Sequence, residues 1–346
     1  MKLTDNIIEL NRDMEPYVLQ ATVPRSQHNF KKLFGDKAVP LSFVHLSDIH
    51  AAKAEWNRMV EYVNHYSDCI SFVLHTGDYC GGSQKSYVNF YQDGDPCVRP
   101  IYNCVGNHDC YSGEGPWSLA EKSSVHRLLF PNADTWDVSF MDCEYSMSYF
   151  KDFPESNIRL IVLDLYYHIW ETRVWLKGLL EDAREKGLHV VTAMHERTGY
   201  IETHLGDTYS SLDPYRAAKE EYELARTAYD FDHRGRVLFE DVLADFIKKG
   251  GNYVCNLVGH EHHDEIGTTA RGILNVVVQN GTTWDKHGDM RRYPGTKSQD
   301  CFNVVAIDTD LGLLKIIRIG ANVDHFLRKK GALCFDYINK KIVAES

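Results

Sequence analysis

The sequence predicts an α/β protein in which a β-rich portion follows a run of alternating strands and helices. Up to residue 258, short apolar runs typical of buried strands alternate with amphipathic segments. This alternation predicts parallel strands joined by helical crossovers. Beyond residue 258 only strand patterns appear, which predicts an added antiparallel part.

Nine strands and three helices are expected from these patterns. The strands cover residues 41–46, 70–74, 101–105, 158–163, 190–193, 253–258, 273–278, 302–307 and 313–319. The last two are separated by DTDLG, which predicts a hairpin. The first helix places Trp56, Met59, Val60 and Val63 on one face, at i, i+3, i+4 and i+7. The other helices are expected over 175–183 and 237–246.

One domain over residues 41–320 contains all of these elements. Residues 1–40 are mixed and polar without periodicity, and we expect them to form an N-terminal extension. Residues 197–236 are charged and rich in tyrosine, which indicates a cap or insertion over a site. Residues 321–346 are expected to be a C-terminal tail, with an added hairpin against the sheet as the structured alternative.

The balance of charge restricts the classes of partner. The chain of 346 residues is long enough to bury a proper core and carries a formal net charge of −11. Nucleic acids and membrane surfaces are anionic, so this charge argues against nonspecific binding to either. A small anionic substrate can still bind at a locally positive site.

Cysteine usage and the N-terminus indicate the compartment. The chain has nine cysteines, which is an odd number, and no two of them form a CxxC motif. Several of them lie within apolar runs. This pattern is typical of reduced core residues and not of a disulfide framework. The N-terminus has no apolar signal core, and no stretch is apolar enough to span a membrane. We therefore expect a cytoplasmic protein without a membrane segment.

Polar side chains follow six of the expected strands, at the point where each strand ends. In chain order they are Asp48 and His50, Asp78, Asn107 with His108 and Asp109, Asp164, His195, and the run His260-Glu261-His262-His263-Asp264. Ligands of open α/β sheets gather beyond the carboxyl ends of the strands. Carboxylate, amide and imidazole groups suit borderline and hard divalent metals, and the lack of cysteine at these ends argues against structural zinc.

Each of these residues taken singly has a more ordinary interpretation. Gly106-Asn107 is normal turn chemistry, Asp164 can cap a strand end, and a lone His195 is more often a buried histidine with a hydrogen-bond partner. Independent turns have no reason to place these residue types in this order after successive buried strands. The combination therefore predicts a metal site.

The ordered series Asp48-x-His50, Gly77-Asp78, Gly106-Asn107-His108-Asp109, His195 and Gly259-His260-x-His262 resembles the motifs of the calcineurin-like metallophosphoesterases. The resemblance spans about residues 41–264 and implies a four-layer α/β/β/α sandwich of two mixed β-sheets, with a dinuclear metal site at the carboxyl ends of the strands. It is specific for the superfamily and says little about the substrate.

The resemblance also implies which residues bind the two metals. Asp48, His50, Asp78 and His262 would hold one ion, and Asp78, Asn107, His195 and His260 the other, with Asp78 bridging. His263 is a competing ligand within the HEHHD run. His195 is followed by Glu196-Arg197, where many members of the family have a proline-containing loop, so the contacts around His195 are open.

The chemistry of phosphoester hydrolysis suits these residue types. Two divalent ions can clamp a phosphate and activate a water for in-line attack, and with two carboxylates the site keeps a charge of about +2. An aspartate in place of Asn107 would lower that charge. His108 would protonate the leaving group, and Asp109 would orient its ring. The ligand set favours Mn or Fe, with Zn, Co and Ni as alternatives.

The expected activity is hydrolysis of a small phosphoester, with a slight preference for phosphodiesters. The alternatives are a phosphomonoesterase, a nucleotide pyrophosphatase or, more remotely, a metal-binding scaffold that has lost catalysis. The acidic chain argues against a nucleic-acid substrate. Arg197, His204 and Arg216 in the expected cap are interpreted as surface residues, with phosphate or cap contacts as the alternative.

Overall fold

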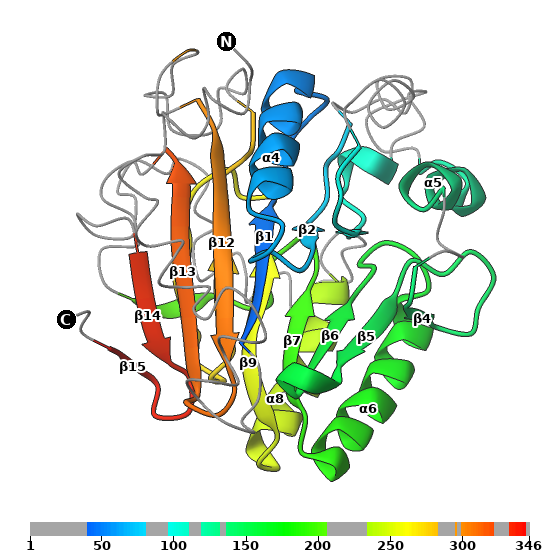
Figure 1. Ribbon diagram of the computed structural model, residues 1–346. Coiled ribbons are helices and arrows are strands. Elements are labelled where there is room, and N and C mark those ends of the chain that lie inside the picture. Colours follow the sequence, from blue (N-terminus) through cyan, green and yellow to red (C-terminus); the bar gives the residue numbers. More distant parts are fainter. Residues whose placement is uncertain are drawn as a thin grey trace.

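Two mixed β-sheets form the centre of the molecule, which is shown as a ribbon in Figure 1. The computed structural model describes residues 40–80, 96–110, 119–131, 136–205, 234–282, 295, 299–321 and 332–343. The expected N-terminal extension, except Pro40, lies outside these residues, as does most of the expected cap over 197–236. No helix among the described residues combines the length and apolar character needed to span a bilayer.

Within the described residues, the first sheet has seven strands and combines segments from the first third of the chain with segments beyond residue 300. In spatial order they are β15 (Lys341–Ile342), β14 (Ala332–Asp336), β13 (Leu313–Gly320), β12 (Cys301–Asp308), β1 (Leu41–Leu46), β2 (Val73–His75) and β3 (Ile101–Asn103). β1, β2 and β3 are parallel, whereas β12 to β15 pair in antiparallel fashion. The predicted hairpin around DTDLG is the β12–β13 connection.

The second sheet has eight strands among the described residues, all from the middle of the chain. In spatial order they are β4 (Ser139–Phe140), β5 (Tyr149–Phe153), β6 (Ile158–Val162), β7 (His189–Ala193), β9 (Asn252–Val258), β11 (Leu274–Val277), β10 (Glu265–Thr269) and β8 (Ile201–His204). β6, β7, β9 and β11 are parallel, and antiparallel strands flank them.

Helices cover the two sheets. α4 (Lys53–His65) buries the predicted face of Trp56, Met59, Val60 and Val63, and its Tyr62 ring contacts Phe302 of β12. α6 (Ile169–Lys186) and α8 (Arg234–Lys248) pack against each other beside β7 and β9. The short α5 (Lys122–Leu129) follows β3. The predicted four-layer α/β/β/α sandwich is therefore confirmed.

Side chains between the sheets join them into one core. Phe72 stacks on Phe153 with ring centroids 5.2 Å apart, and the Tyr149 hydroxyl donates to the carbonyl oxygen of Asn103 at 3.0 Å. The buried apolar side chains of both sheets form one continuous cluster. This packing fixes the position of the strand ends of one sheet relative to those of the other.

Most of the predicted strands differ from the observed ones by one or two residues at an end, and the largest shift is at the start of β2. β2 begins at Val73 and not at Ile70, because the amide of Ile70 donates to Tyr66 O at the end of α4. β2 also extends to His75. The strands β4, β5, β8 and β10 were not predicted, because their polar residues mask the alternation expected of a strand.

The ends of the predicted cap and the tail contain regular structure. Residues 201–204 form β8, an edge strand, and residues 234–236 belong to α8. In the tail, β14 pairs with β13, and β15 pairs with β14.

Candidate metal centre

The predicted ligands lie on loops at the carboxyl ends of five strands, where the two sheets meet. Backbone hydrogen bonds tie these loops within each sheet: Asp48 N donates to Gly77 O at 3.0 Å, and Gly259 N donates to His195 O at 2.9 Å. His260 N donates to Asp48 Oδ2 at 2.8 Å and so connects the loop after β9 to the loop after β1. Residues from distant parts of the chain are thereby held together.

Five of the predicted ligands have a left-handed backbone conformation. Their φ angles are +51° for Asp48, +45° for His50, +59° for Asp78, +64° for His260 and +53° for His262. Such a conformation costs a non-glycine residue about 1 kcal/mol or more and persists only where the surroundings enforce it. Five such residues in these loops indicate that the backbone adopts an unfavourable conformation in order to point the side chains toward the site.

Two glycines beside the ligands allow this close approach. Gly77 has φ +100°, and a Cβ there would lie 2.5 Å from His195 Nδ1. A Cβ on Gly259 would lie 1.7 Å from Ser47 Oγ and 2.4 Å from Asp48 Oδ2. Any side chain at either position would displace a predicted ligand.

The first ligand set brings Asp48, His50, Asp78 and His262 together at one point, with one donor atom of each within 4.8 Å of all the others. All four side chains are buried. His262 Nε2 lies 3.1 Å from Asp48 Oδ1 and 3.2 Å from His50 Nε2. His50 Nδ1 lies 3.1 Å from Cys80 O, so Nδ1 carries the hydrogen and Nε2 presents its lone pair to the cluster.

The second ligand set, which adds Asn107, His195 and His260, lies directly beside the first. His195 Nε2 lies 2.9 Å from Asn107 Oδ1 and 3.2 Å from His260 Nδ1. Asn107 Oδ1 is 3.2 Å from His260 Nδ1. His195 Nδ1 is 2.7 Å from Thr76 O, which fixes the hydrogen on Nδ1 and leaves Nε2 as the ligating nitrogen.

Asp78 lies between the two sets, and its Oδ2 atom provides the test for a cation. This atom is buried and forms no hydrogen bond of good geometry with a described residue. Imidazole Nε2 atoms of His195, His108 and His50 nevertheless surround it at 3.3, 3.9 and 4.0 Å. A buried carboxylate oxygen among inward-facing imidazole nitrogens suits a bridging metal ligand, so these residues fit divalent cations.

The close approach of carboxylates and imidazoles also shifts the pKa values of His195 and Asp78. Burial works to lower the pKa of His195, but the charges of Asp78 and Asp48 outweigh it and raise this pKa to about 10. Burial likewise works to raise the pKa of Asp78, but the charge of His195 lowers it. The carboxylate charges that favour a proton on His195 would also favour a divalent ion in its place.

His108 lies at the rim of the cluster. Its side chain is 36% exposed, whereas that of Asp78 is only 1% exposed. Its backbone N–H donates to Asp78 Oδ1 at 2.8 Å, which places the ring beside the metal ligands. Burial lowers the pKa of His108, and the charge of Asp78 opposes this shift. An imidazole in this position can exchange a proton with a bound substrate and with solvent.

The expected hydrogen bond between Asp109 and the His108 ring is not formed. Among the described residues, the Asp109 carboxylate accepts backbone N–H groups of Asp78, Gly106, Tyr79 and Cys80 at 2.9–3.2 Å and also contacts Cys80 Sγ. This carboxylate therefore fixes the loop that carries Asp78 and not the ring of its own neighbour. The sequence order suggested the wrong partner because His108–Cys110 forms a 3₁₀ turn that directs Asp109 into the protein.

Two further residues from the strand ends lie apart from the ligand sets. Asp164 Oδ1 accepts the amides of Tyr166 and Tyr167 at 2.8 and 3.1 Å and so caps a turn. His263 Nδ1 lies 2.7 Å from Glu261 O, and its Nε2 lies 3.6 Å from Glu265. These contacts place the His263 ring on the other side of the loop from His260 and His262.

The sequence-based interpretation of Arg197 as a surface residue is wrong. Arg197 is only 4% exposed and is ion-paired with Glu261 and Glu265. His204 contacts Glu265 at 2.6 Å, and Arg216 lies outside the described residues. The only signal of this arrangement in the sequence is the alternation of glutamate with histidine around residue 261.

Comparison with known proteins identifies the family to which the chain belongs. A sequence model of the calcineurin-like phosphoesterases matches residues 41–264, and the chain belongs to this family. It is a metal-dependent hydrolase of phosphoester bonds. No curated protein matches the sequence of the chain.

Several solved structures are similar to the chain at low sequence identity. A dimetal phosphatase from Danio rerio is 13% identical, with a TM-score of 0.53 over 81% of this chain and 96% of that one. An archaeal phosphodiesterase is 11% identical, with a TM-score of 0.35 over 81% and 100%. A protein from Thermus thermophilus is 11% identical, with a TM-score of 0.40 over 86% and 99%. The first of these shares the fold.

Proposed function

We propose that the enzyme hydrolyses a small phosphodiester with two divalent metal ions. The observation that carries the proposal is the pair of adjacent ligand sets that share Asp78, with His108 at their rim. Asp48, His50, Asp78 and His262 would hold one ion, and Asp78, Asn107, His195 and His260 the other. Bound there, the ions would polarise the phosphate and activate a water for in-line attack.

The residues of the chain have separate tasks in this reaction. Asp78 would hold both ions at a fixed separation. The neutral amide of Asn107 would ligate without lowering the positive charge of the site, which favours an anionic substrate. His108 would donate a proton to the leaving alkoxide, for which its partly exposed ring is suited. Asp109 would support this geometry through the loop of Asp78.

The preference for diesters rests on the charges around the ligands. A monoester dianion carries more charge than a diester monoanion and gains more from an additional fixed cation. Within the part of the chain that the structure describes, Arg197 and Arg318 near the ligand loops are both paired with buried carboxylates. This arrangement favours the less charged substrate.

The metal and the location complete the proposal. The mixed carboxylate, amide and imidazole ligands favour Mn or Fe, with Zn, Co and Ni as alternatives. The acidic chain and its scattered cysteines favour a cytoplasmic enzyme that does not act on nucleic acid.

The direct test compares two substrates on the apo protein reconstituted with Mn²⁺. We expect kcat/KM for bis-p-nitrophenyl phosphate to exceed that for p-nitrophenyl phosphate at least about tenfold. The opposite preference would identify a phosphomonoesterase. Absence of turnover with two ions bound would favour a scaffold, and absence of bound metal would overturn the ligand assignment. Repeating the assay with Fe²⁺ and Zn²⁺ ranks the metals.

A further inference from the structure

A buried group of charged side chains lies on the far side of the loop that carries His260 and His262. We call it the Arg197 cluster; its members are Arg197, His204, Glu261, His263 and Glu265. Arg197 Nη1 lies 2.5 Å from Glu265 Oε2, and Arg197 Nε lies 3.2 Å from Glu261 Oε1. The side chains of these three residues are at most 9% exposed.

Arg197 joins the segments that carry ligands of both sets. It follows the predicted ligand His195 by two residues, after the end of β7. Its partner Glu261 stands between His260 and His262, after the end of β9. Its other partner, Glu265, is the first residue of β10. One guanidinium group thereby connects the loop after β7, the loop after β9 and the start of β10.

The loop between β9 and β10 needs such support because its backbone is strained. His260 and His262 both have positive φ, and Glu261 N donates to Gly259 O at 2.7 Å in a tight turn. A turn of this kind relaxes unless neighbouring contacts hold it. At its end, Asp264 is ion-paired with the fully buried Arg318 and accepts Gln279 N at 2.9 Å. The corresponding anchor in the middle of the turn is Glu261.

We propose that Arg197 is a positioning residue for the metal centre. By holding Glu261 and Glu265 with its planar fork, it keeps the turn in the conformation that directs both imidazoles to the metals. The inference rests on the proposed ligand roles of His260 and His262. In this scheme Arg197 contacts neither the metals nor the substrate, and it acts only through the turn.

Charge gives Arg197 a second effect in the same direction. Its positive charge lies between two buried carboxylates. Burial works to raise the pKa of Glu265, but the hydrogen bonds of His204 and His263, aided by the charge of Arg197, keep it low. Without Arg197, two buried carboxylates would lose their shared cation, which is a large penalty for buried groups. Glu261 would then lose this ion pair beside its neighbouring imidazoles. Both effects disturb the ligand turn.

The test measures metal binding and not only turnover. We would determine Mn²⁺ stoichiometry and Kd by equilibrium dialysis for the wild type, Arg197→Met and Arg197→Lys, together with the Tm of each apo protein. The matched control is Arg159→Met. Arg159 is also buried and paired with two carboxylates, Asp152 and Asp182, but lies at the amino end of β6.

A positioning role predicts a specific pattern among these variants. Arg197→Met should weaken Mn²⁺ binding by about 10- to 100-fold, as is typical when a group supporting metal ligands is lost. Arg197→Lys keeps the positive charge but not the planar guanidinium group. We therefore expect its affinity for Mn²⁺ to lie between those of the wild type and Arg197→Met. Arg159→Met should lower the Tm and leave Kd unchanged.

Equal Kd values for Arg197→Met and the wild type would overturn the inference. If Arg197→Met does not fold, Arg197→Lys and Glu261→Gln decide: both should weaken Mn²⁺ binding severalfold, and unchanged Kd values in both would overturn it. A wild type that binds no Mn²⁺ would instead contradict the proposed function. The two failures are thus distinguishable.

Discussion

The two ends of the β-sheets both contain buried charge, but they differ in how that charge is paired. At the carboxyl ends, His50 Nε2 faces His262 Nε2 at 3.2 Å, and Asp78 Oδ2 is enclosed without a hydrogen bond of good geometry to a described residue. At the amino ends, Arg159 is just as buried, yet it donates to Asp152 at 2.7 Å and to the carbonyl oxygen of Leu179 at 2.9 Å. Only the first arrangement requires a further cation.

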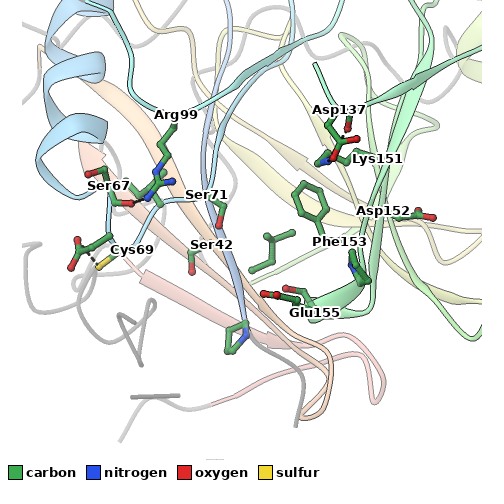
Figure 2. Close-up of a pocket in the computed structure, with 16 residues that line it drawn as sticks. Ser42, Ser67, Cys69, Ser71, Arg99, Asp137, Lys151, Asp152, Phe153 and Glu155 are labelled. Atoms are coloured by element: carbon green, nitrogen blue, oxygen red, sulfur yellow. Dashed lines mark hydrogen bonds and ion pairs between the residues drawn. The ribbon is translucent and has the colours of Figure 1, made fainter. Parts of the chain in front are cut away.

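The amino ends also hold the cavity shown in Figure 2, which has a volume of about 500 Å³. On one side Arg99 donates to Ser67 O, and on the other Lys151 Nζ lies 2.7 Å from Asp137 Oδ2. Both cations of its wall therefore already have an acceptor. The metal-binding end of the sheets is therefore distinguished by several acceptor atoms that point to one place, and not by the volume of a cavity.

The largest effect is expected at Asp78, where the two ligand sets meet. Asp78→Asn should lower kcat for bis-p-nitrophenyl phosphate by about 10³-fold or more and remove at least one bound metal, because the bridging charge is lost. Asp152→Asn is the matched change at the amino ends and should leave kcat unchanged. Activity of Asp78→Asn within tenfold of the wild type would remove the proposed distinction between the two ends.

A smaller effect is expected at the rim of the metal centre. His108→Ala should lower kcat by about 10²-fold for an alkyl phosphodiester, because the leaving alkoxide needs a proton. The loss should be smaller for a p-nitrophenyl ester, whose leaving group is stable as an anion. Metal content should not change. The exposed His65 serves as control, and His65→Ala should resemble the wild type. Equal losses on both substrates would contradict the acid role.

The smallest effect is expected at Asp164. This side chain is buried near the carboxyl ends, but its carboxyl group already has hydrogen-bond partners, the amides of Tyr166 and Tyr167. Burial raises its pKa to about 7, above its value of about 3.9 in the unfolded chain. The unfolded state therefore releases this proton first, and stability is lost as the pH rises from about 4 to 7.

Asp164→Asn removes that titration and keeps an acceptor for the amides of Tyr166 and Tyr167. The variant should unfold at the same temperature as the wild type near pH 4 and be more stable by about 1–2 kcal/mol at pH 8. Thermal unfolding at several pH values measures this difference. A difference that does not vary with pH would show that Asp164 does not titrate in this range.

Much of the fold follows from local patterns in the chain. The helical face of α4 and the runs that form β1, β7 and β9 are predicted well, because burial of one face imposes a regular spacing of apolar residues. β8 and β10 are missed, because their polar residues mask the alternation expected of a strand and because they pair with each other across a long stretch of chain.

The sequence by itself determined the residue types at the strand ends, and with them the metal-binding character of the site. Only the tertiary structure decided which neighbour each side chain meets. Asp109 binds the loop of Asp78 instead of the adjacent His108, and Arg197 is buried against Glu261 and Glu265. The reason is physical: burial and ion pairing depend on which loops the two packed sheets bring together, and these loops lie far apart along the chain.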